Sequence, residues 1–195
     1  LKGQGFAQSK NDPCLFVNPK TGVSIVTWVD DLIVRGSDRE TRLFYSALSK
    51  RFEVKDPSFL TPDSPLQFLG MDITMQGAVG TPQYYIDQNS SMSEWLLSTG
   101  VNPKPNVKCP MPESKTLYED MTEVTEERAA WYRSVVGMLN YFSATTRYDI
   151  AYPVSRLSQF SHKPTVSAEL AAKRVIQYLY NNSEFYLEGY GPVDY

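Results

Sequence analysis

Asp30 and Asp31 are adjacent acids in an otherwise apolar run, residues 27–34, and they are the side chains best suited to chemistry. Two neighbouring carboxylates repel each other, and burying either one unpaired would cost several kcal/mol. On an exposed turn they would supply oxygen ligands of the kind that Mg²⁺ takes, usually one or two carboxylates together with substrate phosphates. The competing explanation is an ordinary turn, because Asp favours turns through local hydrogen bonds. By itself the pair favours the ordinary turn.

A β-hairpin is the element that we expect to position the two acids. Residues 23–29 predict one strand and residues 32–35 the next, which places Asp30 and Asp31 at the turn. A preceding strand over residues 14–17, followed by a turn, completes three antiparallel strands around the acids.

A helix is expected directly after this hairpin. Ser37 or Asp38 is a good N-cap, and apolar residues recur at helical spacing to about residue 52. The apolar stripe predicts that the helix packs on one face of the sheet. Residues 1–12 predict only the tail of a helix and a loop.

The middle of the chain predicts a second hairpin and a short helix. Residues 66–75 and 83–88 form the expected strands, with glycines and a proline between them. Asn89 or Ser90 then caps a helix that ends at Gly100.

The last part of the chain is predicted to be helical. Residues 101–125 are polar and rich in proline, so we expect an extended linker and the domain boundary there. Apolar stripes predict three antiparallel helices over residues 126–145, 148–160 and 165–180. The closing residues 185–190 predict a strand that leads out of the fragment. The expected fold class is therefore α+β.

Composition narrows the class of protein. The chain has 195 residues, 42% of them hydrophobic, which suffices for one domain or two small ones. No apolar stretch approaches the roughly 20 residues of a membrane span and no signal peptide is visible, so we expect no membrane partner.

A net charge of −3 argues against nucleic-acid binding through bulk positive charge. Cys14 and Cys109 indicate neither a zinc site nor a disulfide framework, and the start at Leu1 indicates a fragment.

Seven short segments occur in an order that points to a family. They are Asp-Pro-Cys-Leu-Phe-Val at 12–17, Trp-Val-Asp-Asp at 28–31, Phe-Glu-Val-Lys-Asp at 52–56, Phe-Leu-Gly-Met at 68–71, Tyr-Arg-Ser-Val-Val-Gly-Met-Leu-Asn-Tyr at 132–141, Thr-Arg-Tyr-Asp-Ile at 146–150, and Ala-Ala-Lys-Arg-Val-Ile-Gln-Tyr-Leu at 171–179. With these segments the chain resembles the C-terminal half of a copia-type (Ty1/copia) LTR-retrotransposon reverse transcriptase, a portion of the Pol polyprotein. The match covers nearly the whole chain.

The resemblance implies a domain organisation for the chain. Residues 1–100 would be a partial polymerase palm with the acidic hairpin and a primer-grip-like hairpin, residues 101–125 a linker, and residues 126–195 a helical thumb or connection region. It also implies two-magnesium nucleotidyl transfer, with Asp30 and Asp31 as catalytic metal ligands and Asp30 as the essential one. The implied nucleic-acid-binding residues are Trp28, Phe68, Leu69, Gly70, Met71, Lys173 and Arg174.

The resemblance further implies partners that lie outside this chain. A complete enzyme would use an RNA or DNA template-primer and deoxynucleotides, with fingers and another palm aspartate upstream and a ribonuclease H segment downstream. Such polymerases work in cytoplasmic virus-like particles. The chain departs from the family pattern at Trp28, where Tyr is usual, at Tyr148, where Pro is usual, and after Gly189-Tyr190. We therefore expect the chain not to polymerise alone.

Some conspicuous residues have simpler explanations. His162 lies between two predicted helices, and a solvated loop position is favoured over catalysis. Lys173 and Arg174, together with Arg147, Arg156 and Lys163, fit either a phosphate-binding face or an ordinary solvated helix surface. Trp131, Tyr132, Tyr141 and Phe142 have the spacing of core residues rather than of a stacking platform.

Two functional hypotheses follow from the sequence. The first is the palm and thumb part of a nucleotidyl-transferring enzyme. The second is a noncatalytic retroelement remnant that acts as a nucleic-acid or protein-binding module. The acidic pair favours the first, while the acidic overall charge and Trp28 favour the second.

Overall fold

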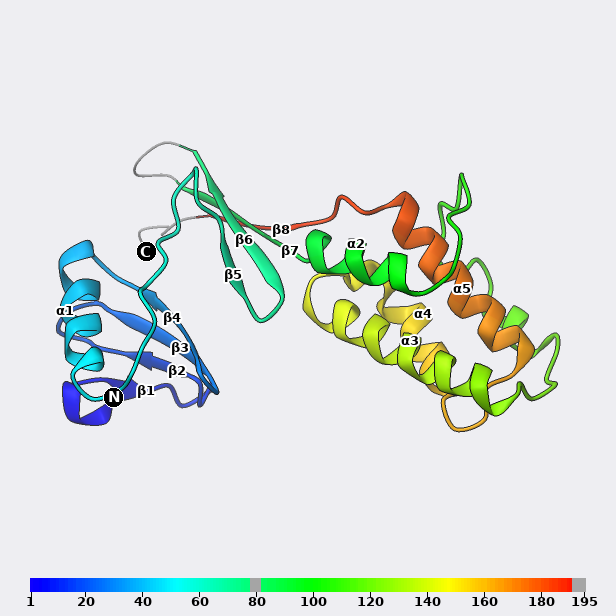
Figure 1. Cartoon of the computed structure of the whole chain (residues 1–195), viewed down its shortest axis with the longest axis horizontal. Coiled ribbons are helices and arrows are strands. Elements are labelled where there is room, and N and C mark those ends of the chain that lie inside the picture. The colour runs from blue at the N-terminus through cyan, green and yellow to red at the C-terminus, as the bar shows by residue number, and fades with distance from the viewer. Residues whose placement is uncertain (78–81, 191–195) are drawn as a thin grey trace. The chain divides into compact units, whose positions relative to one another are not determined.

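The computed structural model describes residues 1–77 and 82–190 and shows an α+β fold, as expected. The chain divides into two compact units, Leu1–Phe59 and Leu60–Tyr195. Each unit contains one antiparallel four-stranded sheet with helices (Figure 1). The boundary between the two units therefore lies near residue 60. The sequence predicted the boundary in the proline-rich segment, residues 101–125.

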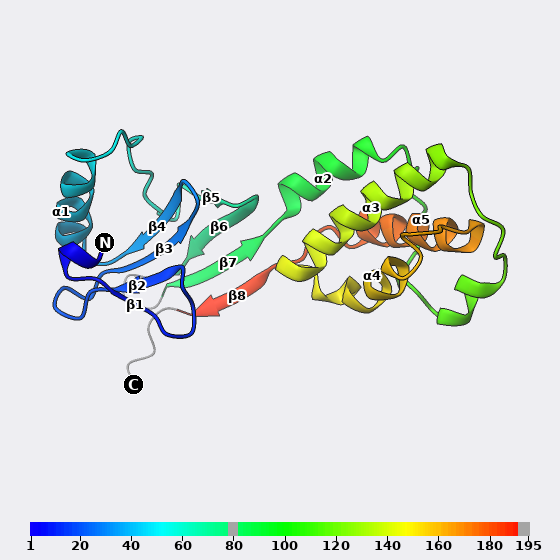
Figure 2. The same ribbon diagram turned by 90° about the horizontal axis from the view of Figure 1, so that it is seen from below.

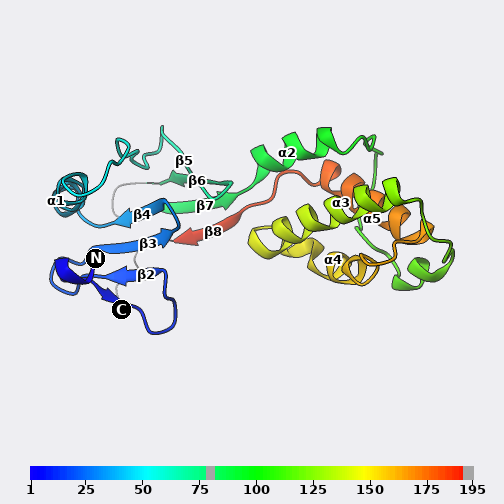
Figure 3. The ribbon, with the colours of Figure 1, turned by 60° about the horizontal axis from the view of Figure 1, so that its bottom comes forward.

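The first unit is a small sheet with one helix. Its elements are a 3₁₀ turn, Lys2–Gln4, the strands β1 (Ala7–Gln8), β2 (Leu15–Val17), β3 (Ser24–Trp28) and β4 (Asp31–Arg35), and the helix α1 (Asp38–Ser49). The strands pair in the order β1-β2-β3-β4, and β2, β3 and β4 run in alternating directions (Figure 3). Strand β1 was not predicted from the sequence, because two residues are too few to give a periodic signal.

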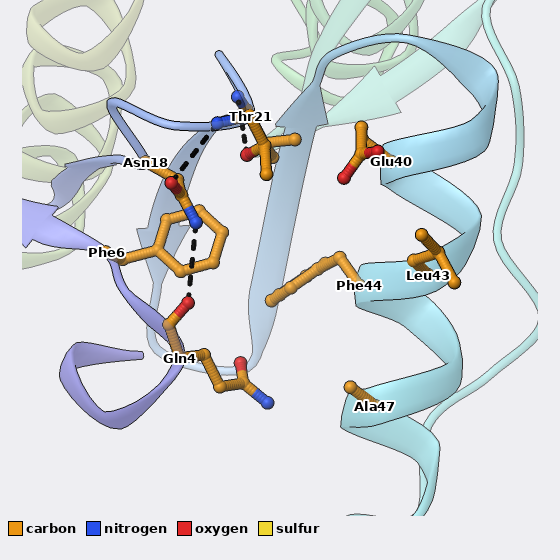
Figure 4. Close-up of a pocket in the computed structure, with 9 residues that line it drawn as sticks. Gln4, Phe6, Asn18, Thr21, Glu40, Leu43, Phe44 and Ala47 are labelled. Atoms are coloured by element: carbon orange, nitrogen blue, oxygen red, sulfur yellow. Dashed lines mark hydrogen bonds between the residues drawn. The ribbon is translucent and has the colours of Figure 1, made fainter.

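Helix α1 begins where the sequence placed it and covers one face of this sheet. The Ser37 side chain accepts a hydrogen bond from the Glu40 amide, which satisfies one of the free N–H groups of the first turn. Phe44 projects from α1 toward Phe6, and the two rings meet edge to face at 5.6 Å (Figure 4). With Val23 and Ile25 these rings form the core of the unit.

A shallow cavity of about 200 Å³ lies between α1 and the turn after β2 (Figure 4). The buried Asn18 closes this turn, because its side-chain oxygen accepts from the Lys20 and Thr21 amides. Its amide nitrogen donates to the Gln4 carbonyl. The polar atoms of Asn18 are thus used in holding the loop.

The second unit begins with three consecutive antiparallel strands and adds a fourth from the far end of the chain. The strands are β5 (Leu66–Phe68), β6 (Met71–Gln76), β7 (Gln83–Asp87) and β8 (Leu187–Tyr190), paired in that order. One row of apolar side chains crosses all four strands, at Leu66, Ile73, Ile86 and Leu187. The neighbouring row, Gln67, Asp72 and Asp87, is polar and lies on the opposite face, because successive side chains of a strand point to opposite faces.

The helices of the second unit pack around one core (Figure 2). They are α2 (Asn89–Ser98), α3 (Glu126–Thr145), α4 (Ala151–Ser158) and α5 (Val166–Asn181), with short 3₁₀ segments at Ser114–Tyr118 and Tyr148–Ile150. The largest fully buried side chains of these helices are Met92, Leu96, Tyr132, Leu139, Phe142, Leu157, Ile176 and Leu179. The three helices expected after residue 125 are confirmed.

Several elements of the second unit differ from the predictions made from the sequence. The expected strand 66–75 is two strands, because the chain turns at Leu69 and Gly70, and part of the connection expected after it lies outside the described residues. The predicted closing strand is confirmed over Leu187–Tyr190 as β8, and it pairs with β7, a partner that the sequence did not indicate. Gln88 occupies the N-cap of α2 without a side-chain cap, since the Asp87 carboxylate accepts from the Asn89 amide.

Residues 101–125 are not a free linker. Val107, Met111 and Leu117 are buried, and Leu117 is fully buried beneath α5. The segment is also held by hydrogen bonds, because the Ser167 hydroxyl accepts from the Asp120 amide at 2.8 Å. Prolines prevent regular structure here but leave the apolar side chains free to pack.

None of the helices in the described part of the chain is both long and apolar enough to cross a membrane.

Candidate functional site

The acidic hairpin has the tight form that the sequence predicts, but its turn lies one residue earlier. Trp28 pairs with Asp31, so the two turn residues are Val29 and Asp30, and Asp31 begins β4. This register places Val34 opposite the buried Ile25. The expected turn would have paired Ile25 with a glycine, which has no side chain to pack, so core packing selects the observed register.

The turn is strained at Val29. Its φ of 50° lies in the left-handed region, where a β-branched residue is an outlier. A two-residue hairpin favours positive φ at its centre, so the strand register imposes this conformation on whichever residue stands there. Val29 is 88% exposed and therefore contributes no packing that would offset the strain. Strain of this kind costs about 1–3 kcal/mol and gathers at functional sites.

The hairpin presents both acids to solvent. Asp30 and Asp31 are exposed, and neither carboxylate is paired with a cation or a hydrogen-bond donor among the described residues. Asp31 lies opposite Trp28, so both side chains project from the sheet face away from Ile25 and α1. Trp28 is 55% exposed, and an indole therefore stands beside the acidic tip.

This donor set fits a hard divalent cation in part. Two carboxylates match the number that Mg²⁺ usually takes from a protein, with water and phosphate oxygens completing its six positions. In the parts of the chain that are described, no three acidic, histidine or cysteine side chains gather into a metal-binding group. The pair would therefore hold Mg²⁺ only together with ligands from elsewhere.

The Phe-Leu-Gly-Met segment forms a second tight turn, in the other unit. Phe68 pairs with Met71, which leaves Leu69 and Gly70 as the two turn residues. Both have positive φ, 52° and 73°, the combination typical of a type I′ hairpin. We call residues 68–71 the grip turn. Phe68, Leu69 and Met71 are half-buried and Gly70 is exposed.

The basic residues proposed for phosphate contact are held by other groups. The Lys173 ammonium lies 2.6 Å from the buried Glu169 carboxylate and over the Trp131 ring. The Arg174 Nε donates to the Cys109 carbonyl at 3.2 Å. Burial acts to raise the pKa of Glu169, but Lys173 and Arg128 outweigh it and lower that pKa, so this carboxylate stays charged.

Other sequence expectations can also be placed. Arg147 is 1% exposed and so cannot belong to a solvated basic face. His162 lies exposed in a bend, as the loop explanation predicts. Tyr132 and Phe142 are core residues, whereas Tyr141 is 38% exposed and its expected core position is wrong. Adjacent residues of a helix point about 100° apart, so the apolar stripe through Phe142 was the available signal that Tyr141 faces outward.

The relatives of this chain are Pol polyproteins of copia- and Ty1-type retrotransposons. It is 35% identical over 182 residues to the retrovirus-related Pol polyprotein from transposon RE1 of Arabidopsis thaliana, and 33% identical over 180 residues to that from transposon RE2. Each of these matches covers 90% of this chain but only 11% and 12% of the two polyproteins.

A shorter relative is found in yeast. The putative transposon Ty5-1 protein of Saccharomyces cerevisiae is 29% identical over 194 residues, which is 96% of this chain and 59% of that protein. No protein-family model and no solved structure matches the chain. The chain is therefore similar to one segment of these retrotransposon Pol polyproteins and spans about one ninth of the length of the two plant polyproteins.

Proposed function

We propose that this chain is the palm and thumb portion of a copia-type reverse transcriptase, which extends a primer by RNA-directed deoxynucleotide addition. The observation that carries the proposal is the exposed, unpaired Asp30-Asp31 pair at a strained two-residue hairpin tip. An ordinary turn needs neither a second carboxylate nor a left-handed valine. The order of motifs and the kinship to retrotransposon Pol polyproteins support the same function.

In this proposal the chain's own residues position the reacting groups. Asp30 and Asp31 would hold Mg²⁺, which when bound neutralises phosphate charge and orients the attacking and leaving oxygens. The hairpin keeps the two carboxylates on a rigid β scaffold, so little reorganisation is needed during reaction. Trp28, on the same sheet face as Asp31, would border the primer end. The remaining ligand and the fingers would come from upstream polyprotein sequence.

Template-dependent incorporation tests the proposal directly. The chain is joined to its native upstream sequence, and deoxynucleotide incorporation on a primed RNA template is measured with Mg²⁺. Asp30→Asn should lower the rate on the order of 100-fold or more, because a charge that acts in the transition state is lost. The control is Asp38→Asn, which removes an exposed acid at the start of α1 in the same unit. No incorporation by the unsubstituted protein, or equal loss in both variants, would contradict the proposal.

The second candidate is a noncatalytic binding module. It is favoured by the net charge of −3 and by the intramolecular partners of Lys173 and Arg174. Primer-template affinity measured against salt concentration separates the two, since phosphate contacts give a negative slope. The polymerase proposal expects this negative slope, whereas a flat, undetectable binding signal would favour the noncatalytic module.

A further inference from the structure

The grip turn is attached to the helices of its own unit by two hydroxyl groups. The Tyr141 hydroxyl, from the end of α3, donates to the Leu69 carbonyl at 2.5 Å. The Ser91 hydroxyl, from the first turn of α2, lies 3.1 Å from the Gly70 carbonyl and 3.2 Å from the Gln88 carbonyl, which share its hydrogen. Two successive carbonyls of the turn thus face two different helices. Figure 1 shows the tip of the β5–β6 hairpin beside the start of α2 and the end of α3.

Tyr141 also explains why position 70 is glycine. A Cβ atom at Gly70 would lie 2.6 Å from the Tyr141 hydroxyl, closer than side-chain carbons approach other atoms. Gly70 also has a φ of 73°, which side chains rarely adopt. The turn and the tyrosine therefore fit each other sterically as well as through the hydrogen bond.

The anchor is itself held rigidly. Tyr141 precedes Phe142, which is fully buried and packs against Trp95 of α2 at 5.4 Å between ring centroids. The Tyr141 ring lies 5.5 Å from that of Phe142. Because Phe142 fixes this end of α3 in the core, the Tyr141 hydroxyl has a defined position outside it. Tyr141 is thus 38% exposed because its side chain points out of the core toward the Leu69 carbonyl.

We infer that Tyr141, assisted by Ser91, is a positioning residue that fixes the grip turn on helices α2 and α3 for contact with a primer-template duplex. The inference rests on the proposed function, since it assigns the turn a nucleic-acid contact. The hydroxyl bonds restrict the turn before nucleic acid arrives, so less conformational freedom is lost on binding. Movement of the helices would be transmitted to the turn through the same two bonds.

Single-atom variants test this arrangement in the 195-residue chain. Tyr141→Phe and Ser91→Ala each remove one anchoring hydroxyl and leave the packing atoms in place. The matched control is Tyr180→Phe, which removes a tyrosine hydroxyl that donates to the Leu96 carbonyl at 2.7 Å within the same unit. Hydrogen exchange at the Gly70 and Met71 amides reports the turn, and binding of a labelled RNA–DNA primer-template duplex at low salt reports its use.

The expected result separates positioning from general stability. Tyr141→Phe should speed exchange in the turn and weaken duplex binding, each on the order of 2- to 12-fold, the range of one net hydrogen bond. Ser91→Ala should act in the same direction with a smaller effect, because its hydrogen is shared. Tyr180→Phe should change thermal stability about as much as Tyr141→Phe but leave turn exchange and duplex affinity unchanged.

Three results would overturn the inference. If the unsubstituted chain binds the duplex and Tyr141→Phe binds equally well, the anchor does not serve binding, while the proposed polymerase function still stands. If turn exchange is unchanged in Tyr141→Phe, the hydroxyl does not hold the turn. If the unsubstituted chain shows no duplex binding, the nucleic-acid role of the turn fails, and incorporation by the joined protein then decides the proposed function separately.

Discussion

Replacing Asp149 by alanine should destabilise the helical part of the chain by about 3–5 kcal/mol, the usual cost of leaving one member of a buried ion pair uncompensated. The Arg147 guanidinium is 1% exposed. Its Nε and Nη2 donate to the two Asp149 carboxylate oxygens at 2.9 and 2.7 Å, and Tyr178 donates to the same carboxylate at 2.9 Å. Alanine would leave a buried charge without its counter-ion.

The contacts that remain cannot replace the carboxylate. The third guanidinium nitrogen of Arg147 lies 3.3 Å from the Met92 sulfur. The guanidinium carbon lies 5.1 Å from the centroid of the Phe185 ring. Each charge-assisted hydrogen bond contributes about 1.5–3 kcal/mol, so two of them account for the expected loss. Against a total stability of about 5–15 kcal/mol, the change would be large.

Tryptophan fluorescence can isolate the helical part during urea unfolding. In a Trp28→Phe background only Trp95 and Trp131 report. Adding Arg147→Met to Asp149→Ala should recover more than half of the loss, because the unpaired charge is then gone. A loss below about 1 kcal/mol for Asp149→Ala, or no recovery in the double variant, would refute the argument, given the magnitudes for buried pairs.

Acid titration provides a second check with a definite sign. Burial acts to raise the pKa of Asp149, but the hydrogen bonds and charge of Arg147, with Tyr178, outweigh it and lower the pKa below 3.8. The stabilisation is therefore complete above the ordinary pKa and is lost as the pH falls through the lower folded value. The stability gap between the parent and Asp149→Ala should shrink below about pH 4, following that ordinary pKa.

Two further substitutions test the hairpins. Val29→Gly should raise the free energy of unfolding of the first unit by roughly 0.5 kcal/mol, since relief of about 1–2 kcal/mol of left-handed strain exceeds the entropy cost of glycine; a loss of stability in urea unfolding, or an equal gain from Val29→Ala, would contradict the strain. Asp87→Asn should stabilise the second unit by about 0.2–1 kcal/mol at pH 7, because Asp87 pairs across the strands with Asp72 while Asn can still accept from the Asn89 amide. Burial first, and then repulsion by Asp72, raise the pKa of Asp87, so the parent gains stability as the pH falls toward the ordinary value and the advantage of Asn should vanish there. An advantage that stays constant from pH 7 to pH 4 would show that the charge is not its cause.

Local periodicity accounts for much of what could be predicted. The helix from Glu126 to Thr145 has its predicted bounds, and Ser37 caps α1 as expected, because both features depend on residues within a few positions of one another. The tight acidic hairpin and the α+β class follow from the same kind of pattern. The carboxylate pair was also visible in the sequence, although by itself it favoured an ordinary turn and only the ordered segments gave it a functional interpretation.

The features that could not be predicted depend on contacts between residues far apart in the sequence. Core packing of Ile25 against Val34 moved the acidic turn by one residue, and no local signal distinguishes those two registers. Burial of the proline-rich segment, pairing of β8 with β7, and the bond from Tyr141 to Leu69 all join residues far apart in sequence. The sequence by itself thus determined which residues could do chemistry and which elements carry them. Only the tertiary structure decided their register, their burial and their supports, because those depend on packing partners that a local pattern does not specify.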